Sequence, residues 1–490
     1  MIDTEALRSK ILDLAIRGKL IEQLPEDGSA EDLYAKIQEE KAQLVKEGKI
    51  KKEKALPEIT EDNIPFTIPK NWKWVRLGDI SAKISSGNTP AGGKKSDVYV
   101  ENGYCFFREQ NIYDDGIHEE GLVYITEELF KTRVNCTVLP MDILLNITGG
   151  SIGRCAMVPD NFTKGSINQH ILIIRMIDPR LRFYVHRCIC SPYVQKYIKG
   201  NVVGDKEGFS GGRCKNLLIP LPPVDEQKRI IDKVNDILER IDEIEILQSQ
   251  YASNVEILKG KLIDAGIRGK LTEQLPEDGD AEDLYNQVQD EKARLIKEGK
   301  FKKEKPLPEI AERELPFEIP KNWKWVRWGN VINIVSARRV HQSDWRNEGI
   351  PFYRAREIAR LADKGTVNND LFISEDLYNE FSKSGIPQCG DLMVTGVGTL
   401  GKAYVVKEND KFYYKDASVL CFENYAGLDA IFLKKLMESD LMQTQINSNS
   451  GGTTVDTLTM VRMNQYLMPL PPLSEQRRIV ERLEAIMEQL

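Results

Sequence analysis

An internal duplication constrains the fold of this chain more than any other feature of its 490 residues. Residues 16–77 align without a gap onto residues 267–328, and 46 of these 62 positions are identical. The pattern PLPPxxEQxRI also occurs twice, at residues 220–230 and 469–479. Because duplicated sequences fold into the same unit twice, the chain must contain two copies of one arrangement.

The stretch 221–271 predicts a single long helix between the two copies. Its apolar residues recur every three or four positions and form a continuous stripe, with charged residues on the other faces. At about 1.5 Å per residue the helix would be roughly 60 Å long, which is more than one small domain needs for its own core. A helix of this length separates domains. The stripe consists of Ile230, Val234, Ile237, Ile241, Ile244, Leu247, Tyr251, Val255, Leu258 and Leu262.

The second copy of this helical arm is split between the two ends of the chain. Residues 473–490 match its first part, and the segment up to Leu20 matches its last part. If the ends meet, they rebuild an arm antiparallel to the first about a pseudo-twofold axis. About ten residues, the counterparts of 242–251, have no match, so we expect this arm to be shorter or gapped. Its stripe would run through Ile479, Leu483, Ile486 and Leu490 toward Leu7 and Ile11.

The repeat divides the chain into five regions. These are an N-terminal helical region (1–70), a first variable block (71–220), a central helical region (221–320), a second variable block (321–472) and a C-terminal helix (473–490). A second helix is expected at residues 30–46 and 281–297, capped by Asp27 or Ser29 and by Asp278 or Asp280. The basic runs KIKKEK and KFKKEK follow it. They could be solvated helix ends or phosphate contacts.

Each variable block is predicted to be mixed α/β. Strand-like runs occur at residues 105–107, 142–146, 171–177, 351–353, 391–394 and 402–406. Turn clusters rich in Gly and Ser interrupt them. We therefore predict an α/β (α+β) fold with two globular domains separated by long antiparallel coiled-coil helices. The clusters are SSGNTPAGGKK, NITGGSIGR, GFSGGR, TGVGTLGK and NSNSGGTT.

The net charge of −7 neither supports nor excludes DNA binding. Residues 72–220 have 19 Lys and Arg against 15 Asp and Glu, and residues 323–472 have 17 of each, so the excess acidity lies in the helical and linking segments. A neutral or mildly basic block can still carry a local basic patch. No apolar run is long enough for a membrane span and no signal-peptide pattern is present, so we expect a cytoplasmic protein.

No motif in the sequence predicts catalysis or a metal site. Walker-type, HExxH, GxSxG and Asn/Asp-Pro-Pro-Phe/Tyr patterns are absent, and the four histidines are dispersed. The eight cysteines lack paired CxxC knuckles, which favours reduced and mostly buried thiols over zinc ligands.

Two glycine-rich turns at matching places could contact a DNA backbone. GGSIGR (149–154) and GVGTLGK (396–402) each follow a strand, and each ends in a basic residue. Glycines let the backbone approach a phosphate closely, although tight hairpins would have the same composition. The candidates in these turns are Ser151, Arg154, Thr399 and Lys402.

Base readout in the major groove requires Arg or Lys for guanine and Asn or Gln for adenine. Any single candidate could be an ordinary surface residue. In the first block the candidates are Arg108, Gln110, Asn111, Asn168, Gln169, His170 and Arg213, and in the second they are Arg338, Arg339, Arg354, Arg356 and Lys415.

The order of arm, variable block and paired PLPPxxEQxRI signature closely resembles the specificity (S) subunits of type I restriction-modification systems. The IRGKL and PKNWKWVR pairs and the glycine turns share in the resemblance, which covers essentially the whole chain. It implies that each block is a target-recognition domain for one half of a bipartite DNA site. It also implies that the arms set the spacing between halves and dock two methyltransferase (M) subunits, through which restriction (R) subunits join.

The same resemblance implies a non-catalytic subunit that binds no cofactor. S-adenosylmethionine, ATP and Mg would act on the partner subunits. The residues expected to pack the arms and dock partners are Ile230, Val234, Ile237, Ile241, Ile244, Ile479, Leu483 and Ile486. Two rival hypotheses remain open: a coiled-coil scaffold that organises proteins without reading DNA, and an enzyme with an embedded nuclease or methyltransferase activity.

Overall fold

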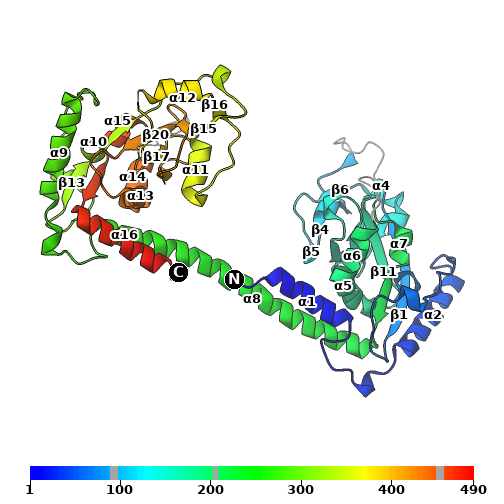
Figure 1. Ribbon diagram of the computed structural model, residues 1–490. Helices are drawn as coiled ribbons and strands as arrows, with labels where there is room; N and C mark the ends of the chain where they lie inside the picture. The colour runs from blue at the N-terminus through cyan, green and yellow to red at the C-terminus, as the bar shows by residue number, and fades with distance from the viewer. Residues whose placement is uncertain (89–97, 202–207, 384, 449–456) are drawn as a thin grey trace. The chain divides into compact units, whose positions relative to one another are not determined.

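A computed structural model describes residues 1–88, 98–201, 208–383, 385–448 and 457–490. The chain forms two compact units, Met1–Ser249 and Gln250–Leu490, and helix α8 (Val224–Ile267) crosses the boundary between them (Figure 1). Parts of the glycine clusters at 85–95 and 447–454 lie outside the described residues.

The two units contain similar but not identical sets of elements. In the first unit the elements are α1 (Thr4–Ile16), α2 (Ala30–Lys46), β1 (Lys73–Arg76), α3 (Leu77–Ile80), β2 (Ser81–Ser86), β3 (Tyr104–Phe107), β4 (Ile112–Tyr113), β5 (Gly116–Ile117), β6 (Val123–Ile125), α4 (Glu127–Lys131), β7 (Thr137–Val138), β8 (Ile143–Asn146), β9 (Cys155–Met157), β10 (Gly165–Ile167), β11 (Ile171–Met176), α5 (Arg182–Cys190), α6 (Pro192–Gly200), α7 (Gly211–Lys215) and β12 (Leu218–Leu221).

In the second unit the elements are α9 (Ala281–Lys297), β13 (Lys324–Arg327), α10 (Trp328–Val331), β14 (Asn333–Val335), β15 (Ile350–Tyr353), α11 (Ala355–Lys364), β16 (Phe372–Ile373), α12 (Glu375–Ser382), β17 (Leu392–Thr395), β18 (Ala403–Val405), β19 (Tyr413–Tyr414), β20 (Val419–Glu423), α13 (Ala430–Glu438), α14 (Asp440–Asn447), α15 (Met460–Gln465), β21 (Leu467–Leu470) and α16 (Leu473–Met487).

A four-stranded sheet forms the centre of each variable block. Its strand order is β2-β11-β8-β9 in the first block and β14-β20-β17-β18 in the second, and all its neighbours are antiparallel. The central strands are buried on both faces, with Leu145 in one core and Leu144 in another. Met393 and Val394 divide in the same way in the second block. This explains why their sequences are apolar throughout rather than alternating.

Each block begins and ends at a two-stranded sheet. Strand β1 pairs with β12, and β13 pairs with β21, so the first and last segments of each block lie side by side. Leu221 therefore belongs to a strand opposite Lys73, and the predicted helix starts three residues later, at Val224, because Pro222 and Pro223 intervene. The helix ends at Ile267 rather than at Leu271. Gly269 follows with φ +66°, a conformation that favours glycine.

The arm forms from antiparallel helices within each unit, as predicted. Helix α1 lies along the first half of α8 and α16 along the second half (Figure 1). In the first unit Ile16 shares a core with Ile230 and Val234, and in the second Ile479 shares one with Ile263. The remaining predicted arm residues are Ile241 and Leu483, which are buried, and Ile237, Ile244 and Ile486, which are half-buried.

The predicted stripe is wrong at three positions beyond Ile244, whereas Val255 and Leu262 are half-buried and Leu262 packs against the second core. Leu247, Tyr251 and Leu258 are 62%, 58% and 41% exposed. The buried positions near the helix end are instead Ile263 and Ile267, because α16 packs there. On α1, the predicted stripe residue Leu7 is also 37% exposed.

The chain ends contact the stretch of α8 that has no sequence counterpart. Gln248 accepts a hydrogen bond from the backbone N–H of Ile2 at 2.5 Å, and the hydroxyl of Tyr251 donates to the carbonyl of Leu490 at 2.9 Å. Arg8 of α1 forms ion pairs with Asp242 and Glu245. Residues 242–251 are therefore contacted by residues near the two chain ends, although the split arm has no counterpart of these ten residues.

The second helix of each repeat has the predicted bounds in both copies. Ser29 and Asp280 are its caps, accepting from the N–H groups of Glu31 and Glu282. The alternatives, Asp27 and Asp278, are wrong as caps of this helix, because they cap the preceding turns at Leu24 and Leu275 instead.

Candidate nucleic-acid interface

The two glycine turns have the same backbone framework. In the first block the β8–β9 turn is closed by a bond from the Gly153 N–H to the Asn146 carbonyl at 2.9 Å. In the second, the Gly401 N–H donates to the Thr395 carbonyl at 2.9 Å in the β17–β18 turn. Both turns thus connect equivalent strands of equivalent sheets, and each is a hairpin loop of seven or eight residues.

Side chains at the start of each hairpin stabilise it. The amide of Asn146 donates to the Ser151 hydroxyl at 3.2 Å, and the Thr395 hydroxyl donates to the Thr399 carbonyl. The predicted residues Ser151 and Thr399 therefore belong to the hairpins themselves. Ser151 is half-buried and Thr399 is exposed.

The hairpin tips are open, whereas their bases are packed. A Cβ atom added to Gly149, Gly150 or Gly398 would meet nothing within 4 Å. By contrast, one at Gly153 would come within 2.3 Å of the Gln195 side chain, and one at Gly401 within 2.7 Å of Ile446. Only the tips can therefore approach another molecule closely.

Polar side chains surround the first hairpin. The ring of His170 contacts the Thr148 hydroxyl at 2.6 Å and the Gln169 amide at 2.8 Å. The guanidinium of Arg154 lies 4.4 Å from the centre of the Tyr113 ring. Gln169 is exposed, and His170 and Arg154 are half-buried, so the structure brings these three predicted residues to one hairpin.

Two predicted residues of the first block are too buried to face DNA. Asn111 is fully buried and Asn168 is 5% exposed. Asn111 donates to the carbonyls of His118 and Glu120, and Asn168 donates to Glu109 at 2.6 Å. Their amides therefore satisfy groups inside the block.

The remaining candidates of the first block differ in exposure. Gln110 is exposed, whereas Arg108 and Arg213 donate to the carbonyls of Gly121 and Asn201 at 2.5 Å and are half-buried. These backbone bonds hold the two arginines in place.

In the second block, Arg354 and Arg356 form an ion-pair cluster. Both bind Glu357, which is fully buried, and both bind Asp370. Burial raises the pKa of Glu357, but the hydrogen bonds from Arg354 and Arg356 outweigh it and bring the pKa to about 2. The predicted base-reading pair thus stabilises the start of α11, with both guanidinium groups paired to carboxylates.

Three other basic residues of the second block are more accessible. Arg338 lies 4.3 Å from the centre of the Phe381 ring and pairs with Glu380. Arg339 is exposed and Lys415 half-buried, and within the described residues neither side chain has an ionic partner. Lys402, at the base of the hairpin, pairs with Asp363 at 2.6 Å.

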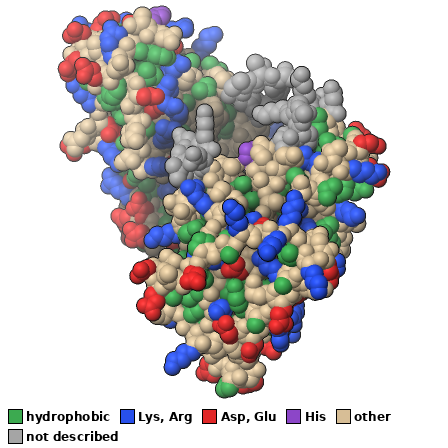
Figure 2. Space-filling view, turned by 90° about the vertical axis from the view of Figure 1, so that its right-hand side faces the viewer, with side chains coloured by type: hydrophobic (Ala, Val, Ile, Leu, Met, Phe, Trp, Pro, Cys, Tyr) green, Lys and Arg blue, Asp and Glu red, His purple; other side chains and the backbone are tan. Residues whose placement is uncertain are grey.

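On the face shown in Figure 2, basic side chains lie among side chains of other kinds. Figure 2 shows Lys and Arg side chains interspersed with acidic and apolar ones over the face in view. This agrees with the small charge excess of the first block. Within the described ranges, no group of three or more His, Cys, Asp or Glu side chains could hold a metal ion. Nor is any described helix long and apolar enough to cross a membrane.

The Glu-Gln pair of each PLPPxxEQxRI signature lies at a buried joint between the arm and its block, a role that the motif alone did not predict. Glu226 accepts from the Asn71 amide at 2.9 Å, and Glu475 accepts from the Trp323 indole at 2.8 Å. Gln274 also donates to Glu475. Each glutamate is fully buried, so it ties the start of an arm helix to the entry of its block.

The arginine of the same signature completes the joint. Arg229 binds Asp27 and the Glu22 carbonyl, and Arg478 binds Asp278 and the Glu273 carbonyl. The arginine and the aspartate of each ion pair both recur in the duplicated sequence, so these equivalent contacts could have been predicted from the repeat.

A family model described as type I restriction modification DNA specificity domain matches residues 69–252 and 320–490. The chain belongs to this family. Each match contains one variable block and the beginning of the arm helix that follows it, which are the parts joined by the buried glutamate. The chain is therefore a type I specificity subunit with two target-recognition domains.

Curated relatives agree with this assignment. The type I restriction enzyme EcoAI specificity subunit of Escherichia coli is 27% identical over 98% of this chain and 88% of its own length. The EcoEI specificity subunit of the same species is 25% identical over the same shares. A solved structure concerned with complex assembly and conformational transition of the type I R-M system has the same fold, with a TM-score of 0.56 at 19% identity over 87% of this chain and 92% of the other.

Proposed function

We propose that each target-recognition domain reads one half of a bipartite DNA site and that the arms fix the spacing between the halves. One observation carries the proposal: two blocks with the same order of strands in the central sheet and a hairpin at the same place, but different side chains, are attached to the arm through buried glutamates that bind the equivalent residues Gln23 and Gln274. Equivalent attachment would present the two readers to DNA in the same manner. Different side chains would give the two half-sites different sequences.

In this proposal the open hairpin tips bind phosphates, and nearby side chains read bases. Gln169, His170 and Arg154 serve the first half, and Arg338, Arg339 and Lys415 serve the second. Phosphate contacts would supply most of the affinity and its salt dependence, whereas base contacts would supply the sequence preference.

We further propose that the arms dock two methyltransferase subunits, with restriction subunits joining through them. The exposed apolar residues of α8 support this role, because water contact with them is unfavourable. They are Ile246, Leu247, Tyr251, Ile257 and Leu258. S-adenosylmethionine, ATP and Mg are assigned to those partners, so that recognition and chemistry would reside on separate chains.

A footprint of the chain assembled with its methyltransferase subunits tests the proposal. We expect protection of two short tracts separated by an unprotected spacer, weakening as salt is raised. Equal binding to all duplexes would instead indicate a protein scaffold. Cleavage or methylation of DNA by the purified chain alone would indicate an embedded enzyme.

A further inference from the structure

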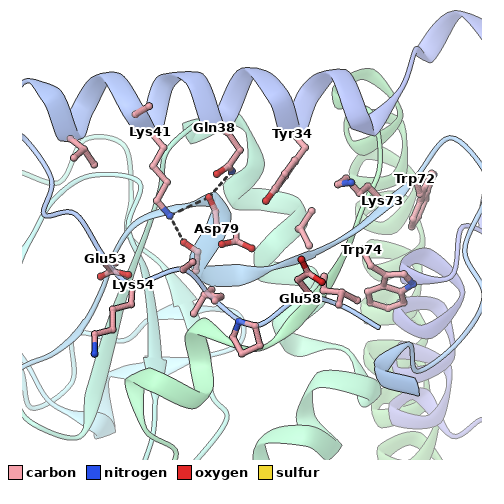
Figure 3. A pocket seen from close by; sticks show the side chains of 18 of the residues that line it. Tyr34, Gln38, Lys41, Glu53, Lys54, Glu58, Trp72, Lys73, Trp74 and Asp79 are labelled. Carbon is pink, nitrogen blue, oxygen red and sulfur yellow. Dashed lines mark hydrogen bonds between the residues drawn. The ribbon is translucent and has the colours of Figure 1, made fainter. Parts of the chain in front are cut away.

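A groove of about 1220 Å³ lies in the first unit between α2 and the extended segment that follows it. Figure 3 shows the side chains of α2 pointing across the groove toward the linker and the entry of the block. Lys41 donates to the Gly78 carbonyl at 2.6 Å, and Gln38 donates to the Asp79 carbonyl at 3.0 Å. These bonds fix α2 as one wall of the groove.

The groove combines an apolar lining with an excess of positive charge. Tyr34, Leu56, Ile59, Ile64, Ile68, Trp72 and Trp74 contribute apolar surface, and Ile64 is 40% exposed. Of the acidic lining residues, Glu53 is paired with Lys215. Five lining lysines are exposed and, within the part of the chain that the structure describes, have no carboxylate partner: Lys46, Lys51, Lys52, Lys54 and Lys70.

The duplication preserves this lining while neighbouring surface changes. Of the 25 lining residues, only Val45, Ala55, Ile64 and Asp79 differ from their counterparts in the second repeat. All five unpaired lysines are retained, as Lys297, Lys302, Lys303, Lys305 and Lys321.

On the other faces of α2, some residues such as Glu31 and Glu40 are retained, whereas others are not. Ala35, Lys36, Glu39 and Gln43 do not line the groove, and their counterparts are Asn286, Gln287, Asp290 and Arg294. Exposed lysines contribute little to folding, so the fold alone does not explain why the rim is identical in both repeats.

The second repeat keeps the anchoring contacts as well. Lys292 of α9 donates to the Gly329 carbonyl at 2.6 Å, and Gln289 donates to the Asn330 carbonyl at 2.9 Å. The two variable blocks have diverged, whereas this surface has not. A surface kept the same in both halves suits a partner that is the same on both sides.

We propose that the groove binds an extended acidic segment of a partner protein, with apolar side chains between its carboxylates, and that the second repeat binds a second copy. The lysine rim would attract the carboxylates, and the Tyr, Ile and Trp surface would cover the apolar side chains. A DNA backbone would use the lysines but leave the apolar lining uncovered, so a protein segment fits the groove better. The identification of the partner as the methyltransferase subunit rests on the proposed function.

Charge reversal in both repeats tests this surface. The variant carries K52E, K54E, K303E and K305E in the full-length chain, and its affinity for the methyltransferase subunit is measured without DNA. We expect a loss of about tenfold or more and a weaker salt dependence, because attraction becomes repulsion at the rim. A control matched in the number of reversed charges carries K19E, K49E, K270E and K300E, at exposed positions outside the groove.

Carbodiimide cross-linking of the wild-type assembly gives a second measurement. The carboxylate adds to the carbodiimide, and the lysine amine then displaces the reagent as a urea, which forms the amide and takes up the elements of water. We expect Lys51, Lys52 and Lys54, and their counterparts, to be joined to one acidic stretch of the methyltransferase subunit.

Two outcomes would overturn the groove proposal while leaving the proposed function intact. In one, the reversed variant binds the methyltransferase subunit as the wild type does. In the other, assembly is normal but DNA affinity falls, which would make the groove a phosphate site. Failure of the wild-type assembly to protect two separated DNA tracts would instead count against the proposed function.

Discussion

At the residue scale, exposure separates base-reading candidates from residues that hold the blocks together. Asn168 and Gln169 are neighbours in sequence, but Asn168 binds Glu109 inside the block whereas Gln169 is exposed. Their residue types are almost interchangeable in a sequence argument. Only the direction of each side chain relative to the sheet assigns its role.

Substitutions near each hairpin should act on one half-site only. The double variant Q169A/H170A is expected to relax sequence preference in the first half, because each lost base contact costs about 1–3 kcal/mol. The double variant R339A/K415A should weaken recognition of the second half-site only. Binding to a panel of duplexes with one half-site randomised measures both effects, and a variant that alters both halves equally would contradict the assignment.

The ion pairs of Glu357 should make the local stability of α11 depend on pH. Because the pKa in the folded state is about 2, below the usual value for glutamate, the ionised form is stabilised. This stability is present above about pH 4 and is lost as pH falls toward 2. E357Q should lower the free energy of local unfolding by about 2–3 kcal/mol at pH 7.

Hydrogen exchange in α11 at several pH values would measure this difference. The gap between wild type and E357Q should shrink at low pH, because protonation makes the two side chains alike. E375Q is a suitable control, since Glu375 forms an exposed pair with Lys411 and should contribute little. An equal effect of both variants would contradict the role assigned to burial.

At the scale of elements, the apolar residues of the arm helix α8 are buried near its two ends and exposed between them. Helix α8 buries Ile230, Val234 and Ile241 against the first unit and Ile263 and Ile267 in the second, and it leaves apolar side chains exposed between them. Periodicity predicted the helix correctly but could not show which faces α1 and α16 would cover.

A pair of glutamate substitutions on α8 separates packing from docking. I241E places a charge at a position that is 3% exposed and should destabilise the first unit by several kcal/mol, about 3 or more. I246E, at a position that is 57% exposed, should leave folding unchanged but weaken binding of methyltransferase subunits.

Thermal unfolding and co-purification with the methyltransferase subunit would measure the two effects. The predicted sites Ile237 and Ile244, which are half-buried, should give intermediate losses of stability. If I246E unfolds the protein, that face of α8 is not free in solution.

At the scale of the whole molecule, the blocks are interchangeable parts on a repeated frame. Each is entered and left through paired strands, and each is joined to the arm by a buried glutamate and an arginine. In the proposed function, the frame carries the geometry and the blocks carry the sequence preference.

Replacing residues 321–472 by residues 71–220 should produce a chain that reads the first half-site twice. The site should become symmetric and keep its spacer, because the joints and the arm are unchanged. Sequencing of methylated sites in cells expressing the variant would reveal the new target. A changed spacer would show that the blocks, and not the arm, set the distance.

The sequence alone determined the repeat, the long helix, the mixed α/β blocks and the family resemblance. These follow from identity between distant segments and from local periodicity, which need no tertiary information. Only the tertiary structure decided that Asn111 and Asn168 are buried, that Arg354 and Arg356 bind Glu357, and that Leu247 and Leu258 are exposed. Burial and pairing depend on which distant segments meet, and spacing within one segment cannot specify them.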